Sequence, residues 1–381
     1  MENIESILLN SNNGSKMEQK KWKISFCIVC ANRLHHLKET LLKNITDNED
    51  YEDLEFILLD YNSKDAMGGW VKEELQPYLS TGKLTYYRTL EPEIFDHSHS
   101  KNVAFKLAKG EIVCNINADH YMGKGFAHFV NRKFNENNNI VLTPIGFHEE
   151  ETDFYPAQDV NGKVCVRKSD FEMVKGFDER MKQYGFEDHD FVYRLQLSGV
   201  KKAFIDDRSF LEFISHEEKE RYTLNAEDIK HVYSDHITPS VSEVIILYKN
   251  GEFEKGTITD YTTLDAENHV YAYQPRSYTI PFVAQNGEES GWLKGTWEFG
   301  NGMFVLTTNA GDEFSYREDI VLSRLITDVY VIEVLLRLRM YYHNRYVMEA
   351  NLEQKGINVN PDSFGKTTVF KNFDYSSGIV V

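Results

Sequence analysis

The sequence predicts an α/β fold: a mostly parallel sheet flanked by helices, followed by a small antiparallel β module and a C-terminal helix. Three observations predict it. Apolar runs alternate with helical segments over the first 120 residues, short alternating runs follow from about residue 241, and apolar residues at helical spacing follow from about residue 317. The 381 residues are enough for two or three domains.

Four apolar, β-prone runs in the first part alternate with segments of helical pattern. The expected strands are 22–30, 54–60, 83–88 and 111–116, and the expected helices are 34–44, 66–79 and 98–109. This order predicts parallel strands with helices on both faces, an arrangement in which ligands bind at the carboxyl ends of strands. Asn32, Asp60 and Asp119 lie at three of those ends.

The pattern from residue 241 onward is typical of antiparallel hairpins, because Asn-Gly turns separate short alternating runs. The expected strands are 244–248, 256–261, 269–273, 278–283, 295–299 and 303–308. We therefore divide the chain into four parts: a loose leader (1–20), an α/β domain (21–240), a β module (241–315), and a helical segment with a loose tail (316–381).

Composition excludes some classes of function. The formal net charge of −18 argues against nucleic-acid binding, which needs a basic face. The sequence has no run of about 18 apolar residues that would span a membrane, although peripheral contact stays open. The N-terminal residues lack the apolar centre of a signal peptide, and four cysteines fit a reducing compartment. We expect a cytoplasmic protein in which Cys27 and Cys30 point to opposite faces of a strand and bind no metal.

Six short motifs occur in order between the first strand and His216. They are Ile24–Arg33 (ISFCIVCANR), Asp60–Asp65 (DYNSKD), Ser100–Glu111 (SKNVAFKLAKGE), Asn117–Asp119 (NAD), Gly176–Glu179 (GFDE) and Glu187-Asp188 (ED). Together they resemble the family-2 glycosyltransferases of the GT-A fold, a Rossmann-like sheet. The segment around Gly185 is also similar to the GWGxEDD pattern of galactosyltransferases.

The resemblance implies an inverting, metal-dependent transfer of a sugar from a UDP-sugar to a hydroxyl of a glycan or lipid-linked glycan. It assigns Asp188 as the base that deprotonates the acceptor and Glu187 as a residue that binds acceptor hydroxyls. Asp119 and His216 would hold Mn²⁺ or Mg²⁺, which neutralises the diphosphate leaving group.

The resemblance also implies a donor site formed by Asn32, Asp60, Lys101 and Asn117. Two of these depart from the family pattern: Asn117 replaces an aspartate, so we expect weaker metal binding, and Lys101 replaces an arginine. The residues also have plainer interpretations: Asp60 as the cap of an Asx turn, Lys101 as a solvated helix lysine, and Glu187-Asp188 as an acidic pair that stabilises a helix start.

Other functions stay open. A nucleotidyltransferase would usually carry a Gly-rich loop after the first strand, which this chain lacks. A non-catalytic glycan-binding protein is kept open by Asn117, and a glycoside hydrolase would not need the nucleotide-site turns. Aromatic residues of the β module, among them Trp297 and Phe299, fit a core, a sugar-stacking platform or a homo-oligomer interface. The galactosyltransferase-like segment favours Gal or GalNAc as the sugar. The Asn-, Lys- and Ile-rich composition without a signal peptide suggests a bacterial enzyme of surface polysaccharide synthesis.

Overall fold

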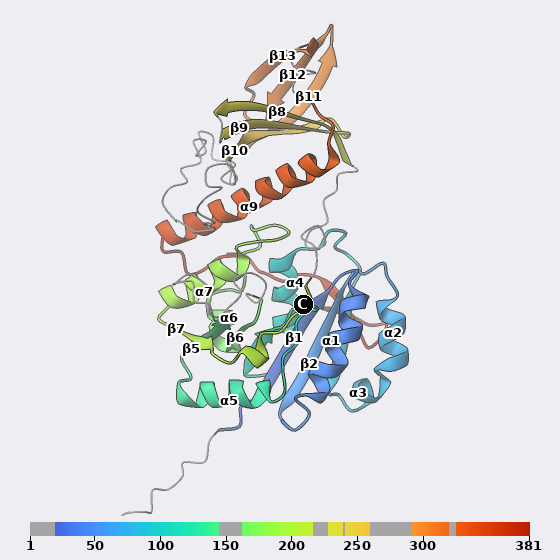
Figure 1. Ribbon diagram of the computed structural model, residues 1–381, viewed down its shortest axis with the longest axis vertical. Helices are drawn as coiled ribbons and strands as arrows, with labels where there is room; N and C mark the ends of the chain where they lie inside the picture. Colours follow the sequence, from blue (N-terminus) through green and yellow to red (C-terminus); the bar gives the residue numbers. More distant parts are fainter. Residues whose placement is uncertain (1–19, 145–161, 216–227, 239–240, 260–291, 320–324) are drawn as a thin grey trace, which may run out of the picture.

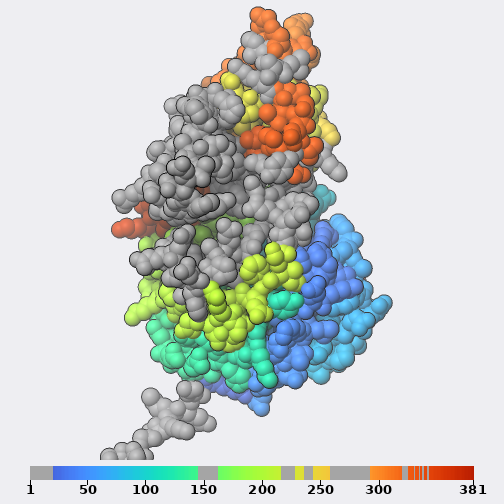
Figure 2. All heavy atoms as spheres, viewed as in Figure 1, coloured from blue at the N-terminus to red at the C-terminus, as the bar shows by residue number. Residues whose placement is uncertain are grey.

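The computed structural model describes residues 20–144, 162–215, 228–238, 241–259, 292–319 and 325–381. The large sheet and its helices form the lower part of Figure 1, and a second sheet forms the upper part. One long helix, α9, crosses obliquely between them. Figure 2 shows the same division in space-filling form, with the blue N-terminal atoms below and the orange atoms of the second sheet at the top.

The large sheet has nine strands in the order β16-β15-β3-β2-β1-β4-β6-β5-β7. Strands β3, β2, β1 and β4 are parallel, and β6 is antiparallel to both of its neighbours. The bounds of the first seven strands are β1 Ile24–Cys30, β2 Leu54–Tyr61, β3 Leu84–Thr89, β4 Ile112–Asn115, β5 Ile140–Pro144, β6 Val164–Arg167 and β7 Lys201–Ile205.

Helices cover both faces of this sheet, which explains why β1 and β2 are apolar at nearly every position. A hydrophobic core lies between each face of the sheet and its helices. Phe26 and Ile28 of β1 belong to the core on one face, and Cys27 and Val29 belong to the core on the other face. The helices on the first face are α1 Leu34–Thr46, α2 Met67–Glu74, α3 Gln76–Ser80 and α5 Phe126–Glu136; those on the second are α4 His97–Leu107, α6 Lys168–Met173 and α7 Glu187–Leu197. The predicted α/β domain, with a mostly parallel sheet between two helical layers, is confirmed.

The CxxC motif falls where the strand pattern predicts. Cys27 and Cys30 lie in the two different cores, and all four cysteines are buried and unpaired. Burial raises the pKa of the Cys27 thiol well above its usual value, which makes the thiolate scarce. These cysteines act as small core residues.

The second sheet has seven strands in the order β13-β12-β11-β10-β9-β8-β14, all antiparallel. Their bounds are β8 Ile229–Thr238, β9 Val241–Tyr248, β10 Glu252–Thr259, β11 Leu293–Gly300, β12 Met303–Thr308, β13 Glu313–Arg317 and β14 Leu325–Ile326. The predicted antiparallel module is confirmed, but its sheet starts at Ile229, because β8 pairs along the whole of β9. The strands expected at 269–273 and 278–283 lie outside the described residues.

Helix α9, Val329–Glu353, is the predicted C-terminal helix. It begins later than the apolar spacing suggests, because residues 313–317 and 325–326 are strands of the second sheet. Leu336 packs against that sheet, and Val347 and Met348 pack against Met181 of the α/β domain. Among the described residues, no helix combines the length and the apolar character that a membrane span requires.

The segment after α9 is not the loose tail that the sequence suggests. It forms β15 Thr368–Lys371 and β16 Gly378–Val380, which extend the large sheet beyond β3. Backbone N and O of Tyr86 bond to Asn372, and the ring of Phe373 stacks on Tyr86 with centroids 4.6 Å apart. The expectation failed because the partner of β15 lies far away in the sequence.

Candidate active site

The carboxyl ends of β1, β2 and β4 lie side by side, so the turns that follow them share one edge of the large sheet. Cys30, the last residue of β1, is in register with Asp60 of β2. The turn after β4 carries Asn117 and Asp119. The sequence prediction that Asn32, Asp60 and Asp119 share this edge therefore agrees with the strand register.

Asn32 joins the turn after β1 to the turn after β2. Its backbone N donates to Oγ of Ser63 at 3.1 Å, and its side-chain Oδ1 accepts from the backbone N of Lys64 at 2.6 Å. Its φ of 56° lies in the left-handed region, which asparagine adopts more readily than most residues. Asn32 thus shapes this edge, and its contact with a donor stays a prediction.

Asp60 is fully buried, and both carboxylate oxygens have protein partners. Oδ1 accepts from the backbone N of Ser63 at 2.8 Å, and Oδ2 accepts from the hydroxyl of Tyr86 at 2.6 Å. The guanidinium of Arg88 lies 3.6 Å from Oδ2. This is the Asx-turn arrangement expected as the plainer interpretation, so Asp60 fixes the turn, and direct donor binding by its carboxylate stays a prediction.

Asn117 and Asp119 lie in the turn after β4, and Asp119 is 6% exposed. Oδ1 of Asn117 accepts from Nδ2 of Asn115 at 3.2 Å, and the backbone O of Asp119 accepts from the backbone N of Ile214 at 2.8 Å. His216, the other predicted metal ligand, lies outside the described residues. Within the described ranges, no three His, Cys, Asp or Glu side chains form a cluster of metal-ligand type.

Lys163 supports the turn that carries Asp119, a function the sequence analysis missed. Its side chain is fully buried, and Nζ donates to the backbone O of Tyr121 and of Phe210. Burial lowers the pKa of Lys163 to about 7, although the negative charge of Asp119 acts in the opposite direction. No local pattern in the sequence distinguishes this lysine from a surface lysine.

Lys101 joins the two predicted catalytic carboxylates. It is 2% exposed, and Nζ donates to Oε1 of Glu187 at 2.9 Å and to Oδ1 of Asp188 at 2.7 Å. The interpretation of Lys101 as a solvated helix lysine is therefore wrong. Its ammonium group binds the carboxylate pair in this structure, and its predicted role in donor binding is not supported by these contacts.

The carboxylates of Glu187 and Asp188 differ in acidity although they share Lys101. Burial raises the pKa of Asp188 to about 6, with Lys101 opposing the shift and Glu187 adding to it. Burial also acts to raise the pKa of Glu187, but Lys101 and His97 outweigh it and hold the pKa at about 2. Glu187 thus stays ionised as the partner of Lys101, and Asp188 can exchange a proton near neutral pH.

His97, at the start of α4, is a further residue of this cluster that the motifs did not indicate. Its Nδ1 lies 3.7 Å from Oε1 of Glu187. Burial lowers the pKa of His97 to about 4, so the ring is neutral at pH 7, while the charges of both Glu187 and Asp119 act on it. His97 therefore lies beside the carboxylate pair and contacts Glu187.

The α/β domain brings the turns after β1, β2 and β4 close to the carboxylates at the start of α7, and this region is also the part of the chain that matches a known family. In the sequence comparison, residues 25–197 match the model of glycosyl transferase family 2. This range includes every predicted site residue except His216.

Similar solved structures cover about half of this chain. They include a mannosyltransferase from Pyrobaculum calidifontis in complex with GDP-Man and Mn²⁺ (20% identity, 49% of this chain and 56% of that one, TM-score 0.40). The chain is also similar to TarS 1–349 of S. aureus in complex with UDP, with 19% identity over 49% of this chain and 58% of that one and a TM-score of 0.40. It is similar as well to GalNAc-T7 with UDP, GalNAc and Mn²⁺, with 15% identity over 50% of this chain and 43% of that one and a TM-score of 0.40. The chain thus spans less than two thirds of these proteins. None of the curated proteins compared matches it.

Proposed function

We propose that this protein is an inverting, metal-dependent glycosyltransferase that moves a sugar from a UDP-sugar to a hydroxyl of a glycan or lipid-linked glycan. The observation that carries the proposal is the buried cluster of Lys101, Glu187 and Asp188 in a family-2 domain. It supplies one carboxylate of fixed charge and one whose pKa is about 6. A single displacement with one base inverts the anomeric carbon.

Asp188 is the base of this proposal. As the acceptor oxygen bonds to the anomeric carbon, the bond from that carbon to the diphosphate oxygen breaks, and the acceptor proton passes to Asp188. Glu187 accepts hydrogen bonds from acceptor hydroxyls, and its position is fixed by Lys101 and by the backbone N of Gly185 at 2.9 Å.

Asp119, with His216, would hold Mn²⁺ or Mg²⁺, and the bound cation would neutralise the charge of the departing UDP. The donor set fits such a cation, because a carboxylate is a hard oxygen ligand. Asn117 adds an oxygen without charge, and Asn32 and Asp60 stay the proposed frame of the donor site, whereas Lys101 bonds to the carboxylate pair.

The finer assignments rest on the sequence. The segment around Gly185 favours Gal or GalNAc as the transferred sugar, and the proposed pathway is surface polysaccharide synthesis. A reducing, cytoplasmic location is supported by four unpaired cysteines. The C-terminal module is the proposed site of homo-oligomer or peripheral membrane contact.

The test measures UDP release from UDP-sugars, and their binding, with Mn²⁺ and with a chelator, for the wild type and Asp119→Ala. We expect metal-dependent release and a loss of at least tenfold in the variant, because the cation loses a charged ligand. Asp206→Ala is the control, since Asp206 is an exposed carboxylate whose partner is Lys133.

If the affinity for the UDP-sugar is the same with the chelator as with Mn²⁺, and the same in Asp119→Ala as in the wild type, the proposed metal site is wrong. No binding of any nucleotide sugar would contradict the transferase itself and favour the glycan-binding alternative, which glycan arrays would then examine.

A further inference from the structure

Helix α9 contacts the loop that leads into the catalytic carboxylates, although it lies outside the residues matched to family 2. The loop consists of residues 178–186 and ends where α7 begins with Glu187. We infer that Asn344 of α9 is a positioning residue that holds this 178–186 loop, and through it Glu187 and Asp188, in the active geometry. The inference rests on the proposed transferase function.

The 178–186 loop contains two non-glycine residues with a positive φ. Gln183 and Phe186 have φ of 57° and 66°, in the left-handed region that non-glycine residues rarely adopt, and Gly185 has φ of 104°. Phe186 is also the N-cap of α7 and makes no side-chain cap. Because neither the backbone nor a cap favours this path, contacts from outside the loop must stabilise it.

Asn344 supplies those contacts at the strained end of the loop. It is 1% exposed, its Oδ1 accepts from the backbone N of Lys182 at 2.9 Å, and its Nδ2 donates to the backbone O of the same residue at 2.9 Å. Nδ2 also lies 3.1 Å from the backbone O of Tyr184 and 2.9 Å from that of Gly185. One side-chain amide therefore bonds to four peptide groups on both sides of Gln183.

Other residues of α9 hold the earlier part of the loop. Asn351 donates to Asp178 at 2.9 Å and to Asp190 of α7 at 2.8 Å, and it accepts from Arg180 at 2.6 Å. Nε2 of His343 lies 2.9 Å from the backbone O of Arg180. The helix thus binds the loop at two points separated by two turns.

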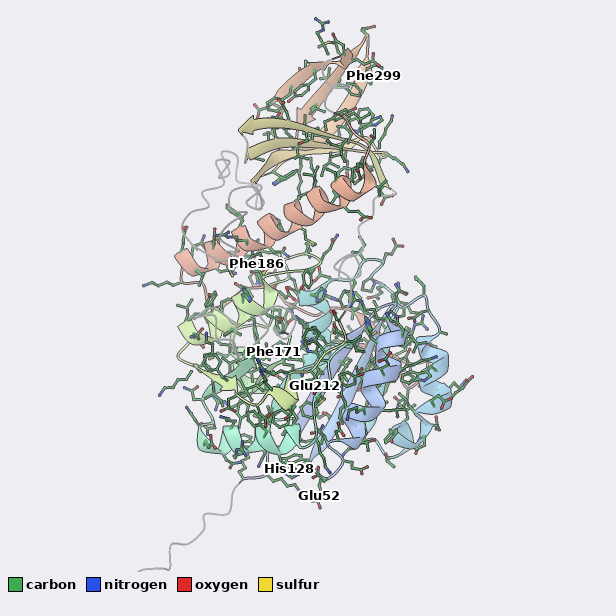
Figure 3. All side chains as sticks on the ribbon, in the orientation of Figure 1. Glu52, His128, Phe171, Phe186, Glu212 and Phe299 are labelled. Atoms are coloured by element: carbon green, nitrogen blue, oxygen red, sulfur yellow. The ribbon has the colours of Figure 1, made fainter. Side chains whose placement is uncertain are left out.

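Apolar packing accompanies these hydrogen bonds. Met181 of the loop is buried against Val347 and Met348 of α9, with Phe186 partly buried beside them. Figure 3 shows Phe186 between α9 and the α/β domain. The contact is therefore an internal interface of the protein.

The loop is connected directly to the carboxylate cluster. The backbone N of Gly185 donates to Oε2 of Glu187 at 2.9 Å, and the backbone O of Gln183 accepts from the N of His97 at 3.1 Å. Glu187 shares the ammonium group of Lys101 with Asp188. A shift of Gly185 would therefore move Glu187, and with it the ammonium group of Lys101 that also bonds to Asp188. Displacements of about 1 Å in an active site can lower a rate by about 10²-fold.

The other end of α9 is fixed to the second sheet. Leu336 packs with Trp292 and Val244, and Arg339 forms an ion pair with Glu254 of β10. The same helix therefore connects the antiparallel module to the catalytic loop, which gives that module a role in the geometry of the site.

The experiment compares Asn344→Ala and Asn344→Asp with the wild type in UDP-sugar turnover and in hydrogen exchange of the full chain. We expect kcat to fall about 10- to 100-fold with donor KM within about twofold, because the acceptor side of the site moves and the donor side does not. Exchange should accelerate in the 178–186 loop. The Asp variant should be at least as impaired, since its carboxylate would face three carbonyl oxygens.

Glu349→Ala is the control, because its hydrogen bond goes to Arg345 within α9. If the Asn344 variants fold poorly, His343→Ala replaces them in the test. This milder variant removes one hydrogen bond to the same loop, and we expect the same pattern with a smaller fall in kcat. The inference would be overturned if the Asn344 variants kept the wild-type kcat and the wild-type hydrogen exchange in the 178–186 loop. It would also be overturned if hydrogen exchange became faster across the whole large sheet and the donor KM rose. A wild type without transferase activity would refute the proposed function, while faster exchange confined to the loop would still support the positioning contact.

Discussion

Lys101 is the only positive side chain that bonds to both Glu187 and Asp188 among the residues the structure describes. Replacing it by the similar-sized, uncharged Met would leave two buried carboxylates without this partner. Breaking a buried pair in this way costs about 3–5 kcal/mol. We expect Lys101→Met to lose stability of that order in denaturant unfolding, and to lose activity at pH 7 because the pKa of Asp188 rises.

Lys72→Met is the matched control, since Lys72 is exposed on α2 and its replacement should change stability by less than about 0.5 kcal/mol. Wild-type stability in Lys101→Met would mean that the ammonium group is not needed to balance the pair.

The acidity of Asp188 predicts the pH dependence of transfer. Burial raises the pKa of Asp188 to about 6. A general base acts only when it is deprotonated, so transfer should slow below that pH, where Asp188 is protonated. We expect kcat/KM to rise between about pH 5 and about pH 7 with a midpoint near 6. Asp188→Asn should lower the rate about 10²- to 10⁴-fold and remove this dependence. A flat profile in the wild type would assign the proton transfer elsewhere.

The sequence predicts Glu187 and Asp188 as the carboxylates of the site, but it does not indicate the groups that set their acidity. Lys101 lies 86 and 87 positions before them, so only the fold brings its ammonium group to the pair. The inward orientation of Asp60 depends similarly on Tyr86, 26 positions away. Motifs indicate which residues do chemistry, whereas burial and long-range partners decide their charge.

At the scale of elements, strand β15 supports the turn that carries Asp60. Phe373 follows β15 and stacks on Tyr86, whose hydroxyl bonds to Asp60. Phe373→Ala would leave a cavity beside this pair, and we expect a loss of about 2–4 kcal/mol in the free energy of unfolding. Val380→Ala, at an 81% exposed position of β16, should be nearly neutral. Equal stabilities of the two variants would argue against this packing role.

The strands and helices of the α/β domain could be predicted because each carries its own signal. Strands β1 and β2 are covered on both faces, so burial makes them apolar at nearly every position, and the helices between them have their own periodicity. Strand β15 has no such signal, since Thr368 and Lys371 enclose only two apolar residues. Its structure comes from pairing with β3, and no local rule indicates that partner.

At the scale of the whole molecule, the domain that matches family 2 depends on later parts of the chain. Asp178 and Asp190 accept from Asn351 of α9, and the backbone O of Phe177 accepts from Asn360. A fragment of residues 20–215 would lose these donors and the strand beside β3. We expect it to be unfolded or to melt far below the full chain in circular dichroism, because buried carboxylates without partners are costly. A fragment that melts with the full chain would show that the domain is independent.

The position of β15 also bears on the order in which the protein is made. Thr89 of β3 and Thr367 beside β15 are 278 residues apart. A ribosome adds roughly 5–20 residues per second. The edge of β3 is therefore unpaired for about 15 to 55 s, until β15 has been synthesised. Exposed strand edges attract other chains, so the nascent protein presents a binding site for chaperones during that interval. A polypeptide whose translation stops before residue 368 would contain every residue that matches family 2, with this edge still open, and cellular quality control would have a means to recognise it.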